Sequence, residues 1–281
     1  MNYLQLTEQE SEYIQTHLDE GVVTITMNKP KKLNGWTSEM MAAFRSAFEK
    51  AKADDGCKVV IFTGTGNYYC AGVNLGGTLK LMAPKKLHTL IIKNNEALFD
   101  LFLTFPKPIL VAVNGPAIGA SVTSATLCDG IIASETATFS TPFAALGITP
   151  EGCSSIQFAR LMGEENAKRM LFSEGWRPNA QEALEVGLIQ HVAPAETLQQ
   201  QAQAIAVQWV KENRKRSFLG GSKLTELQAV NARESIELAN CFLSGPFLKG
   251  QAKFLWSKKK HVPAMMFFLL WVLRPLWRLF L

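Results

Sequence analysis

Three short apolar runs constrain the fold of this chain more than any other feature. They are KVVIFTG (58–64), ILVAVNG (109–115) and DGIIAS (129–134), each rich in β-branched residues. Runs of this length and composition are typical of strands that are buried on both faces of a sheet. Stretches with helical spacing of apolar residues separate them. The alternation of strands and helices predicts an α/β fold with crossover connections.

The remaining elements follow from local patterns. VVTITM (22–27) alternates apolar and Thr side chains, which indicates a half-buried strand. Thr37 precedes a helical pattern that runs to about Ala53, so we expect it to be the N-cap of a helix. Beyond residue 150 we expect no further strands. Further helices are expected at 85–104, 119–127, 153–172, 180–186, 195–212 and 222–257.

Composition excludes several classes of protein. The 281 residues are 47% hydrophobic and 19% charged, which fits one or two globular domains. A net charge of +5 is too small to indicate a nucleic-acid-binding protein. The five cysteines form no CxxC motif and the four histidines have no metal-binding spacing, so we expect a reducing compartment and no metal site. The first twenty residues contain five acids and no Lys or Arg, unlike a signal or transit peptide.

Two loops that follow predicted strands could hold a ligand against the backbone. They are YYCAGVNL (68–75) and NGPAIGASVT (114–123), in which small residues allow close approach. Ala120 would lie in the first turn of a helix, where backbone amides are free. Two converging amides form an oxyanion hole, which stabilises the negative charge that develops in acyl chemistry. Each motif alone also fits an ordinary tight turn.

A third loop, TPFAALGITPEGCSS (141–155), contains a candidate base. Glu151 lies in its PEG turn, close in sequence to the apolar Phe143, Leu146 and Ile148. A partly desolvated carboxylate has a raised pKa and can act as a general base. The alternative is an acid that is favourable near a helix N-terminus and has no catalytic role.

In this order and spacing, YYCAGVNL, NGPAIGASVT and TFSTPFAALGITPEGCSS resemble the crotonase (enoyl-CoA hydratase/isomerase) superfamily. The resemblance runs from about Glu20 to Lys259, and is greatest to peroxisomal Δ3,Δ2-enoyl-CoA isomerases and their chromodomain-fused, non-enzymatic relatives. It implies the crotonase (ClpP-like) spiral of repeated ββα units with a helical C-terminal part. The implied segments are an N-terminal extension (1–19), the core (20–195), a helical trimerisation region (196–260) and an apolar tail (261–281).

The resemblance also implies residue roles. The family stabilises a thioester enolate, and its two oxyanion amides match Val73 and Ala120. The two glutamates of the hydratases match Thr123 and Phe143, neither of which can act as a base, so hydration is not expected. The isomerases carry a single glutamate in the PEG turn, which matches Glu151.

Further positions are implied to bind the coenzyme A thioester. Asn74 stands where the family usually has Asp, which affects the first oxyanion loop. Exposed lysines can also be merely solvated, and apolar residues near Glu151, such as Phe99, Phe143 and Leu146, can be core rather than acyl tunnel. The implied substrate-binding residues are Lys31, Lys32, Leu33, Ala71, Gly72, Asn74, Gly119 and Phe143.

The implied reaction moves the double bond of a 3-enoyl-CoA to the trans-2 position. It needs no metal and no redox cofactor, because coenzyme A is part of the substrate. The resemblance further implies a homotrimer or hexamer, located in a peroxisome or mitochondrion. Two alternatives remain open: a non-catalytic protein that binds acyl-CoA or a protein partner, and another reaction such as dienoyl-CoA isomerisation or thioester hydrolysis.

The C-terminal tail has a composition of its own. VPAMMFFLLWVL (262–273) is almost wholly apolar, and residues 262–281 would extend about 30 Å as a helix. Three lysines at 258–260 precede it, whereas Arg274 and Arg278 oppose a complete span of a bilayer. We therefore expect shallow contact with a membrane surface. The alternative is packing against a neighbouring subunit.

Overall fold

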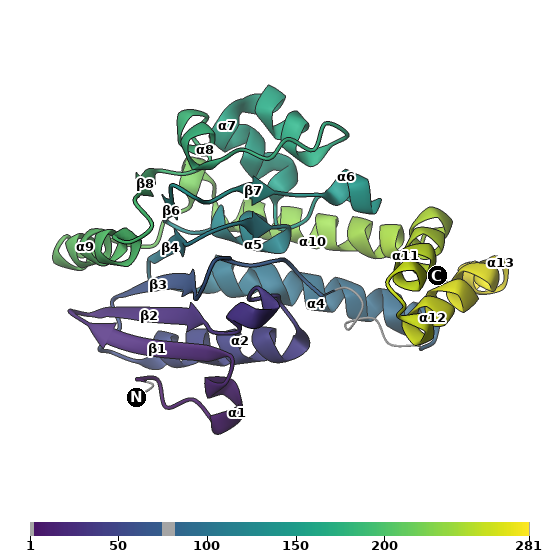
Figure 1. Cartoon of the computed structure of the whole chain (residues 1–281), viewed down its shortest axis with the longest axis horizontal. Coiled ribbons are helices and arrows are strands. Elements are labelled where there is room, and N and C mark those ends of the chain that lie inside the picture. The colour runs from purple at the N-terminus through teal and green to yellow at the C-terminus, as the bar shows by residue number, and fades with distance from the viewer. Residues whose placement is uncertain (1–2, 75–81, 281) are drawn as a thin grey trace.

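A six-stranded sheet forms the centre of the molecule (Figure 1). The computed structural model describes residues 3–74 and 82–280. The first two strands are antiparallel and every later neighbour is parallel, which confirms the α/β fold. In spatial order the strands are β1 (Ile14–Asp19), β2 (Val22–Met27), β3 (Val59–Gly64), β4 (Ile109–Val113), β6 (Gly130–Ser134) and β8 (His191–Ala193). A second, two-stranded sheet pairs β5 (Ala117–Ile118) with β7 (Phe139–Ser140).

The three apolar runs form β3, β4 and β6, in the middle of the sheet. All residues of β3 are buried because both faces of the strand are covered. Val60 and Phe62 belong to the main core, which includes residues of α2 (Ser38–Ala53) and α4 (Pro84–Thr104). Val59 and Ile61 pack with α9 (Leu198–Lys211) on the other face.

Aromatic side chains fix α2 and α4 against the sheet. Phe48 of α2 and Phe102 of α4 meet edge to face, with ring centroids 5.6 Å apart. Both rings also contact Phe62 of β3. Thr37 caps α2 as expected, because its side chain accepts a hydrogen bond from the Met40 amide. These contacts give a rigid base for the loops at the ends of the strands.

The other helices surround this core. The long helix α10 (Leu224–Phe242) lies alongside α4, and the two extend together toward the C-terminal helices (Figure 1). The rest are α1 (Glu8–Ser11), α5 (Ala120–Ala125), α6 (Phe143–Leu146), α7 (Ser154–Leu171), α8 (Ala180–Glu185), α11 (Gly245–Ser257), α12 (His261–Val272), α13 (Arg274–Trp277) and 3-10 turns at Pro30–Lys32, Leu219–Gly221 and Arg278–Phe280.

Two expectations about the C-terminal half are wrong. The strand β8 pairs with β6, although no strand was expected beyond residue 150; three residues are too few to show a periodic pattern. The stretch 222–257 is not one helix, because the chain breaks at Leu243 and restarts at Ser244. The Ser244 side chain accepts a hydrogen bond from the Phe247 amide at 3.3 Å and caps α11.

At the other end of the chain, β1 lies within residues 1–19, so the expected N-terminal extension supplies the edge strand of the sheet.

The apolar tail folds against its own chain. Phe267, Leu270 and Trp277 are buried in a cluster with residues of α4, α10 and α11. Val262 and Leu276 on the outer side are 85% and 67% exposed. Among the described residues, no helix combines the length and the apolar character needed to cross a membrane. We call residues 245–280, from α11 to the last 3-10 turn, the C-terminal lobe.

Candidate active site

The predicted loops meet at one edge of the sheet. The loops after β3 and β4 leave neighbouring parallel strands, so they begin side by side. The Ile118 amide donates to the Cys70 carbonyl oxygen at 3.0 Å, and the Ala71 amide donates to the Leu33 carbonyl oxygen at 2.9 Å. The structure therefore brings the loop at 29–35 together with both candidate oxyanion loops.

Within the described part of the chain, the amides of Val73 and Ala120 are both unpaired. The neighbours of Val73, Gly72 and Asn74, make the two backbone hydrogen bonds to Trp36, which turns the Val73 amide to the opposite side. Ala120 is the first residue of α5, where an amide has no partner within the helix. Among the described residues, no acceptor pairs with either amide.

Glu151 is held in a turn that only glycine can complete. Gly152 has a φ of +67°, and an added Cβ would lie 2.4 Å from the Phe99 ring and 2.6 Å from the Thr123 Oγ1. The turn is therefore pressed against α4 and α5. Thr123 is the position that matches the first hydratase glutamate. From this turn the Glu151 side chain reaches the wall of a cavity, and 9% of the residue is exposed.

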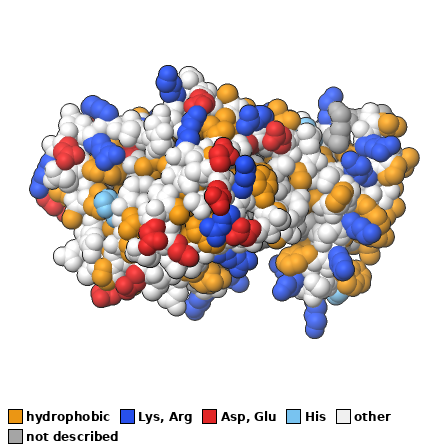
Figure 2. All heavy atoms as spheres, turned by 90° about the horizontal axis from the view of Figure 1, so that it is seen from above, with side chains coloured by type: hydrophobic (Ala, Val, Ile, Leu, Met, Phe, Trp, Pro, Cys, Tyr) orange, Lys and Arg blue, Asp and Glu red, His pale blue; other side chains and the backbone are white. Residues whose placement is uncertain are grey.

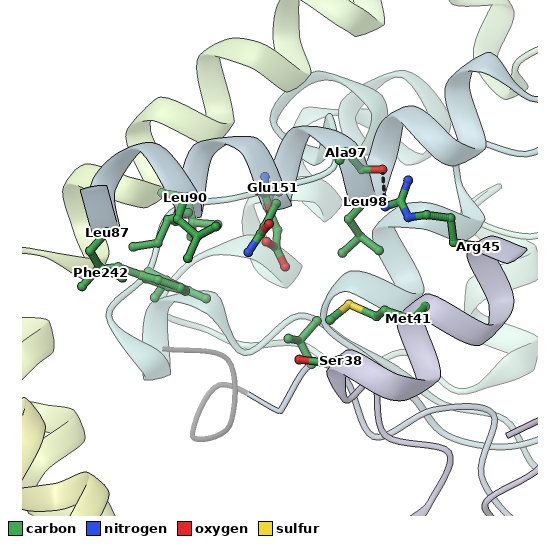
Figure 3. A pocket seen from close by; sticks show the side chains of 16 residues that line it. Ser38, Met41, Arg45, Leu87, Leu90, Ala97, Leu98, Glu151 and Phe242 are labelled. Carbon is green, nitrogen blue, oxygen red and sulfur yellow. Dashed lines mark hydrogen bonds between the residues drawn. The ribbon is translucent and has the colours of Figure 1, made fainter. Parts of the chain in front are cut away.

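An apolar cavity of about 370 Å³ opens beside Glu151, between α2, α4 and α10. Figure 3 shows Glu151 between Leu90 and Leu98, with Arg45 at one end of the cavity. The Arg45 guanidinium donates to the Ala97 carbonyl oxygen at 2.8 Å. The lining residues are Ser38, Met41, Ala42, Arg45, Val73, Leu87, Leu90, Ile91, Asn94, Asn95, Ala97, Leu98, Ile148, Glu151, Leu238 and Phe242.

The surroundings of Glu151 make its carboxyl an unusually strong base. Burial, assisted by the negative charge of Glu234, raises the pKa of Glu151 from 4.5 to about 8. Among the described residues that line the cavity, Glu151 is the only acid. A carboxyl with this pKa can both take up and return a proton near neutral pH.

Glu234 is a buried acid near Glu151 that the sequence patterns did not indicate. It lies on α10, is fully buried, and contacts the residues directly after the PEG turn. Its Oε2 accepts from the Cys153 amide at 2.6 Å and its Oε1 accepts from the Ser155 amide at 3.0 Å. About 80 residues separate these groups in the sequence, so no local spacing could have found them.

The expected substrate-binding residues fall into two groups, and the first lies at the 3-10 turn Pro30–Lys32 and the residue after it. Lys31 and Lys32 are exposed in the 3-10 turn that precedes Leu33, close to Ala71. Asn34, which no sequence motif indicated, is buried and ties this loop to the next. Its Nδ2 donates to the carbonyl oxygens of Thr65 and Tyr68 at 2.9 and 2.8 Å.

Other expected lining residues lie elsewhere. Phe143 and Phe99 are buried in the main core, and Leu146 is 38% exposed; the cavity beside Glu151 is lined by other side chains. The loop sequence could not reveal that the acyl-sized space lies between three helices instead. Within residues 3–74 and 82–280, no group of three His, Cys, Asp or Glu side chains is placed to hold a metal ion.

Comparison with known proteins identifies the family. The family model described as enoyl-CoA hydratase/isomerase matches residues 17–233, which is most of the chain. The chain belongs to this family. Human enoyl-CoA delta isomerase 2 is 35% identical over 251 residues, covering 86% of this chain and 63% of the human protein. The chain thus spans less than two thirds of that relative.

Two further relatives differ in what their names describe. Mouse peroxisomal enoyl-CoA delta isomerase 3 is 35% identical over 193 residues, covering 68% of this chain and 60% of its own. Mouse chromodomain Y-like protein is 31% identical over 237 residues, covering 82% and 40%. An enoyl-CoA hydratase/isomerase from Pseudoalteromonas atlantica has a similar structure, with 27% identity, a TM-score of 0.70 and coverage of 87% and 97%. This similarity confirms the crotonase fold.

Proposed function

We propose that this protein is an enoyl-CoA isomerase that moves the double bond of a 3-enoyl-CoA to the trans-2 position. One observation carries the proposal: a single carboxylate, Glu151, lies at the wall of an apolar cavity that Val73 also lines. The positions that match the two hydratase glutamates hold Thr123 and Phe143. The similarity to the human and mouse isomerases supports the same reaction.

The first step removes a proton from the α-carbon. The thioester oxygen would lie between the amides of Val73 and Ala120, which stabilise the negative charge that develops on it. The C–H bond breaks, the proton goes to the Glu151 carboxylate, and the electron pair moves into the enolate. A single amide donor of this kind is worth about 10²–10³ in rate.

The second step returns the same proton. The enolate electrons re-form the thioester carbonyl, the double bond moves to C2–C3, and the γ-carbon takes the proton from Glu151. The carboxylate is regenerated and the product has the mass of the substrate, so the balance needs no oxidant, reductant or water. The apolar side chains around Glu151 favour this outcome because they exclude water that would compete for the proton.

The exposed turn at 30–33 is suited to the coenzyme A phosphates. Among the described residues, neither Lys31 nor Lys32 forms an ion pair with an acid. Both precede Leu33, whose carbonyl accepts from Ala71 beside the first oxyanion loop. The backbone at Gly72, Asn74 and Gly119 would then surround the thioester.

The deciding experiment is turnover of 3-enoyl-CoA substrates of several chain lengths, with the product followed by mass and ultraviolet absorbance. We expect a conjugated product of unchanged mass. A product heavier by one water would indicate hydration, and release of free coenzyme A would indicate thioester hydrolysis. Either result contradicts the proposal.

A second candidate is a protein that binds acyl-CoA or a protein partner without turnover. The similarity to chromodomain Y-like protein favours it. The presence of Glu151 in the PEG turn, with a strongly raised pKa, favours catalysis instead. Binding of a 3-enoyl-CoA without conversion would establish the second candidate, and conversion of a dienoyl-CoA alone would indicate a related isomerase.

We also propose the setting of this reaction. A homotrimer or hexamer follows from the family resemblance, and a peroxisomal location is supported by the name of the mouse relative. Contact of the C-terminal lobe with a membrane surface is supported by its exposed apolar side chains.

A further inference from the structure

The proposed reaction leaves one buried carboxylate beside the active site without a role. We propose that Glu234 is a positioning residue that fixes the Glu151 turn to α10 and, through its fixed negative charge, sets the basicity of Glu151. This inference rests on the proposed function, because Glu151 is the base in that reaction.

The hydrogen bonds of Glu234 replace a missing helix cap. The N-cap of α7 is Cys153, whose φ is +63° and whose side chain makes no capping bond; its thiol donates instead to the Leu227 carbonyl oxygen at 3.1 Å. Without a cap, the first amides of α7 would be buried and unpaired. Both oxygens of Glu234 accept from them, so the turn is anchored two residues after Glu151.

The same contacts decide which of the two carboxyls ionises first. Burial raises the pKa of Glu234, but the hydrogen bonds from Ser155 and Cys153 lower it. The positive end of α7 also favours an anion at this position. Among the described residues, no hydrogen bond lowers the pKa of Glu151 in this way, and its carboxyl faces an apolar cavity. Glu234 is therefore the charged member, and Glu151 titrates beside it.

Other charged and titratable groups surround the pair. Arg233 is exposed on α10 and donates to the Ser155 hydroxyl at 3.3 Å, and its positive charge lowers the pKa of Glu234. Asp100 of α4 accepts from Asn231 at 3.1 Å. Burial raises the pKa of the Cys153 thiol, so that group is neutral. Arg45 lines the same cavity as Glu151. None of these replaces Glu234 as the acid that contacts the turn after Glu151.

For catalysis, the charge of Glu234 gives Glu151 a base strength that suits both the uptake and the return of the proton. A carboxylate with an ordinary pKa would be a weak base toward the α-carbon and would hold the proton poorly before its return. A fixed negative charge next to Glu151 disfavours its ionised form and strengthens it as a base. The two acids therefore have different roles. Glu234 is charged and holds the turn, whereas Glu151 takes up and returns the proton.

The test compares Glu234→Gln with the wild-type protein across pH. We expect the apparent pKa on the acidic side of kcat/KM to fall by about one unit, because the charge beside Glu151 is lost. We expect kcat on the plateau above that pKa to fall about threefold to tenfold, because a base weakened by about one pKa unit takes up the proton less readily. An unchanged apparent pKa would overturn the proposal.

Two further variants separate charge from structure. Glu237→Gln removes an exposed acid on the same helix, one turn away, and should leave the pH profile unchanged. Glu234→Asp keeps the charge on a shorter side chain, so the apparent pKa should stay near the wild-type value while kcat falls. If Glu234→Gln fails to fold, Glu234→Asp carries the test, and wild-type kcat in that variant would exclude a positioning role.

A direct titration makes this inference independent of turnover. The infrared carboxyl band that is lost in Glu151→Gln reports the protonation of Glu151 without substrate. We expect this band to titrate at lower pH in Glu234→Gln than in the wild-type protein. If no 3-enoyl-CoA is turned over but the band shifts, the proposed reaction is wrong, whereas the effect of Glu234 on the protonation of Glu151 is confirmed. If the band titrates at the same pH in both proteins, that effect is refuted.

Discussion

At the scale of single residues, Glu151 combines two properties that oppose each other. It is a carboxyl group with only 9% of the residue exposed, and the reaction requires its ionised form. Glu151→Gln keeps the shape of the side chain and removes the base. We expect turnover of 3-enoyl-CoA to fall by at least about 10² while coenzyme A binding, measured by calorimetry, persists. Near-normal turnover would show that another group is the base.

Stability provides a second measurement on the same residue. Because the pKa of Glu151 is about 8 in the folded protein and near 4.5 when unfolded, the native state holds this proton more tightly. The free energy of unfolding should therefore fall as pH rises from about 4.5 to about 8, by up to ~1.4 kcal/mol for each pH unit in that window. Glu151→Gln lacks this loss, so in urea unfolding its stability relative to the wild-type protein should increase from about pH 5 to about pH 8.5. A constant difference would contradict the raised pKa.

The amide of Ala120 can be removed with little damage to its helix. Proline is accepted at the first position of a helix, which is where Ala120 lies, and it has no N–H to donate. We expect Ala120→Pro to lower kcat by about 10²–10³. Ala120→Gly keeps the amide and is the matched control. A folded Ala120→Pro protein, as judged by circular dichroism, with full activity would exclude the oxyanion role.

At the scale of elements, one buried ion pair joins several of them. Asp129, at the start of β6, pairs with Arg216 at 2.5 Å and accepts from the Ile109 amide of β4 at 2.8 Å. Arg216 also donates to the carbonyl oxygens of Phe102 and Leu127 at 2.8 and 2.6 Å. The pair therefore holds the segment before α10 against the strands and α4.

Removing Arg216 should destabilise the protein strongly. Burial already raises the pKa of Asp129, and of the two arginines that oppose this effect, Arg216 and Arg214, Arg216 has the larger influence. Arg216→Met leaves the carboxylate buried without its partner, so we expect the free energy of unfolding in urea to fall by about 3–5 kcal/mol. Arg160→Met breaks the more exposed pair with Glu226 and should cost much less. Similar losses in both variants would contradict this account.

The same scale shows which elements the sequence could predict. The buried strands and the Thr37 cap follow from local patterns, and the structure has both. The break at Ser244 was missed because apolar residues continue across it on both sides. Glu234 and the cavity were missed for another reason: they depend on contacts between α10 and segments far away in the chain, which leave no periodic pattern. The loop motifs indicated Glu151 and Val73, and the structure has both residues at the wall of one cavity.

At the scale of the whole molecule, charge is distributed unevenly. Residues 238–281 hold seven of the 29 Lys and Arg side chains and none of the 24 Asp and Glu side chains. The rest of the chain therefore has a slight excess of acids. Of the sixteen large hydrophobic side chains that are exposed among the described residues, ten lie between Phe254 and Leu279. Figure 2 shows Lys, Arg and hydrophobic side chains together on this lobe, at the right.

We infer that this combination serves contact with an anionic lipid surface; the alternative is packing against a neighbouring subunit. Exposed apolar side chains enter the interface of a bilayer, and each nearby lysine or arginine adds about 1 kcal/mol of attraction to anionic lipid. Two copies of the lobe would instead bring like charges together. A segment without a spanning helix can bind in this way, because only its exposed side has to enter the lipid.

Flotation with vesicles tests this proposal directly. We expect the protein to bind vesicles of phosphatidylcholine with about 30% phosphatidylserine, and to bind phosphatidylcholine alone weakly. Reversing Lys258, Lys259 and Lys260 to Glu should lower the affinity by about 10² or more, because three attractive charges become repulsive. Reversing the exposed Lys52, Lys211 and Lys215 on the body of the protein is the matched control and should have little effect.

Substitutions on the exposed apolar side of the C-terminal lobe distinguish lipid binding from subunit packing. Val262→Gln, Leu276→Gln and Leu279→Gln together change side chains that are 67–85% exposed, so the fold should persist. If the lobe binds lipid, this triple variant loses vesicle binding and keeps its oligomeric state in analytical ultracentrifugation. If the lobe packs on a neighbouring subunit, the triple variant dissociates into smaller species. The wild-type protein then binds neither kind of vesicle. That second result would refute membrane contact, because the exposed apolar side chains would then be covered by the protein itself.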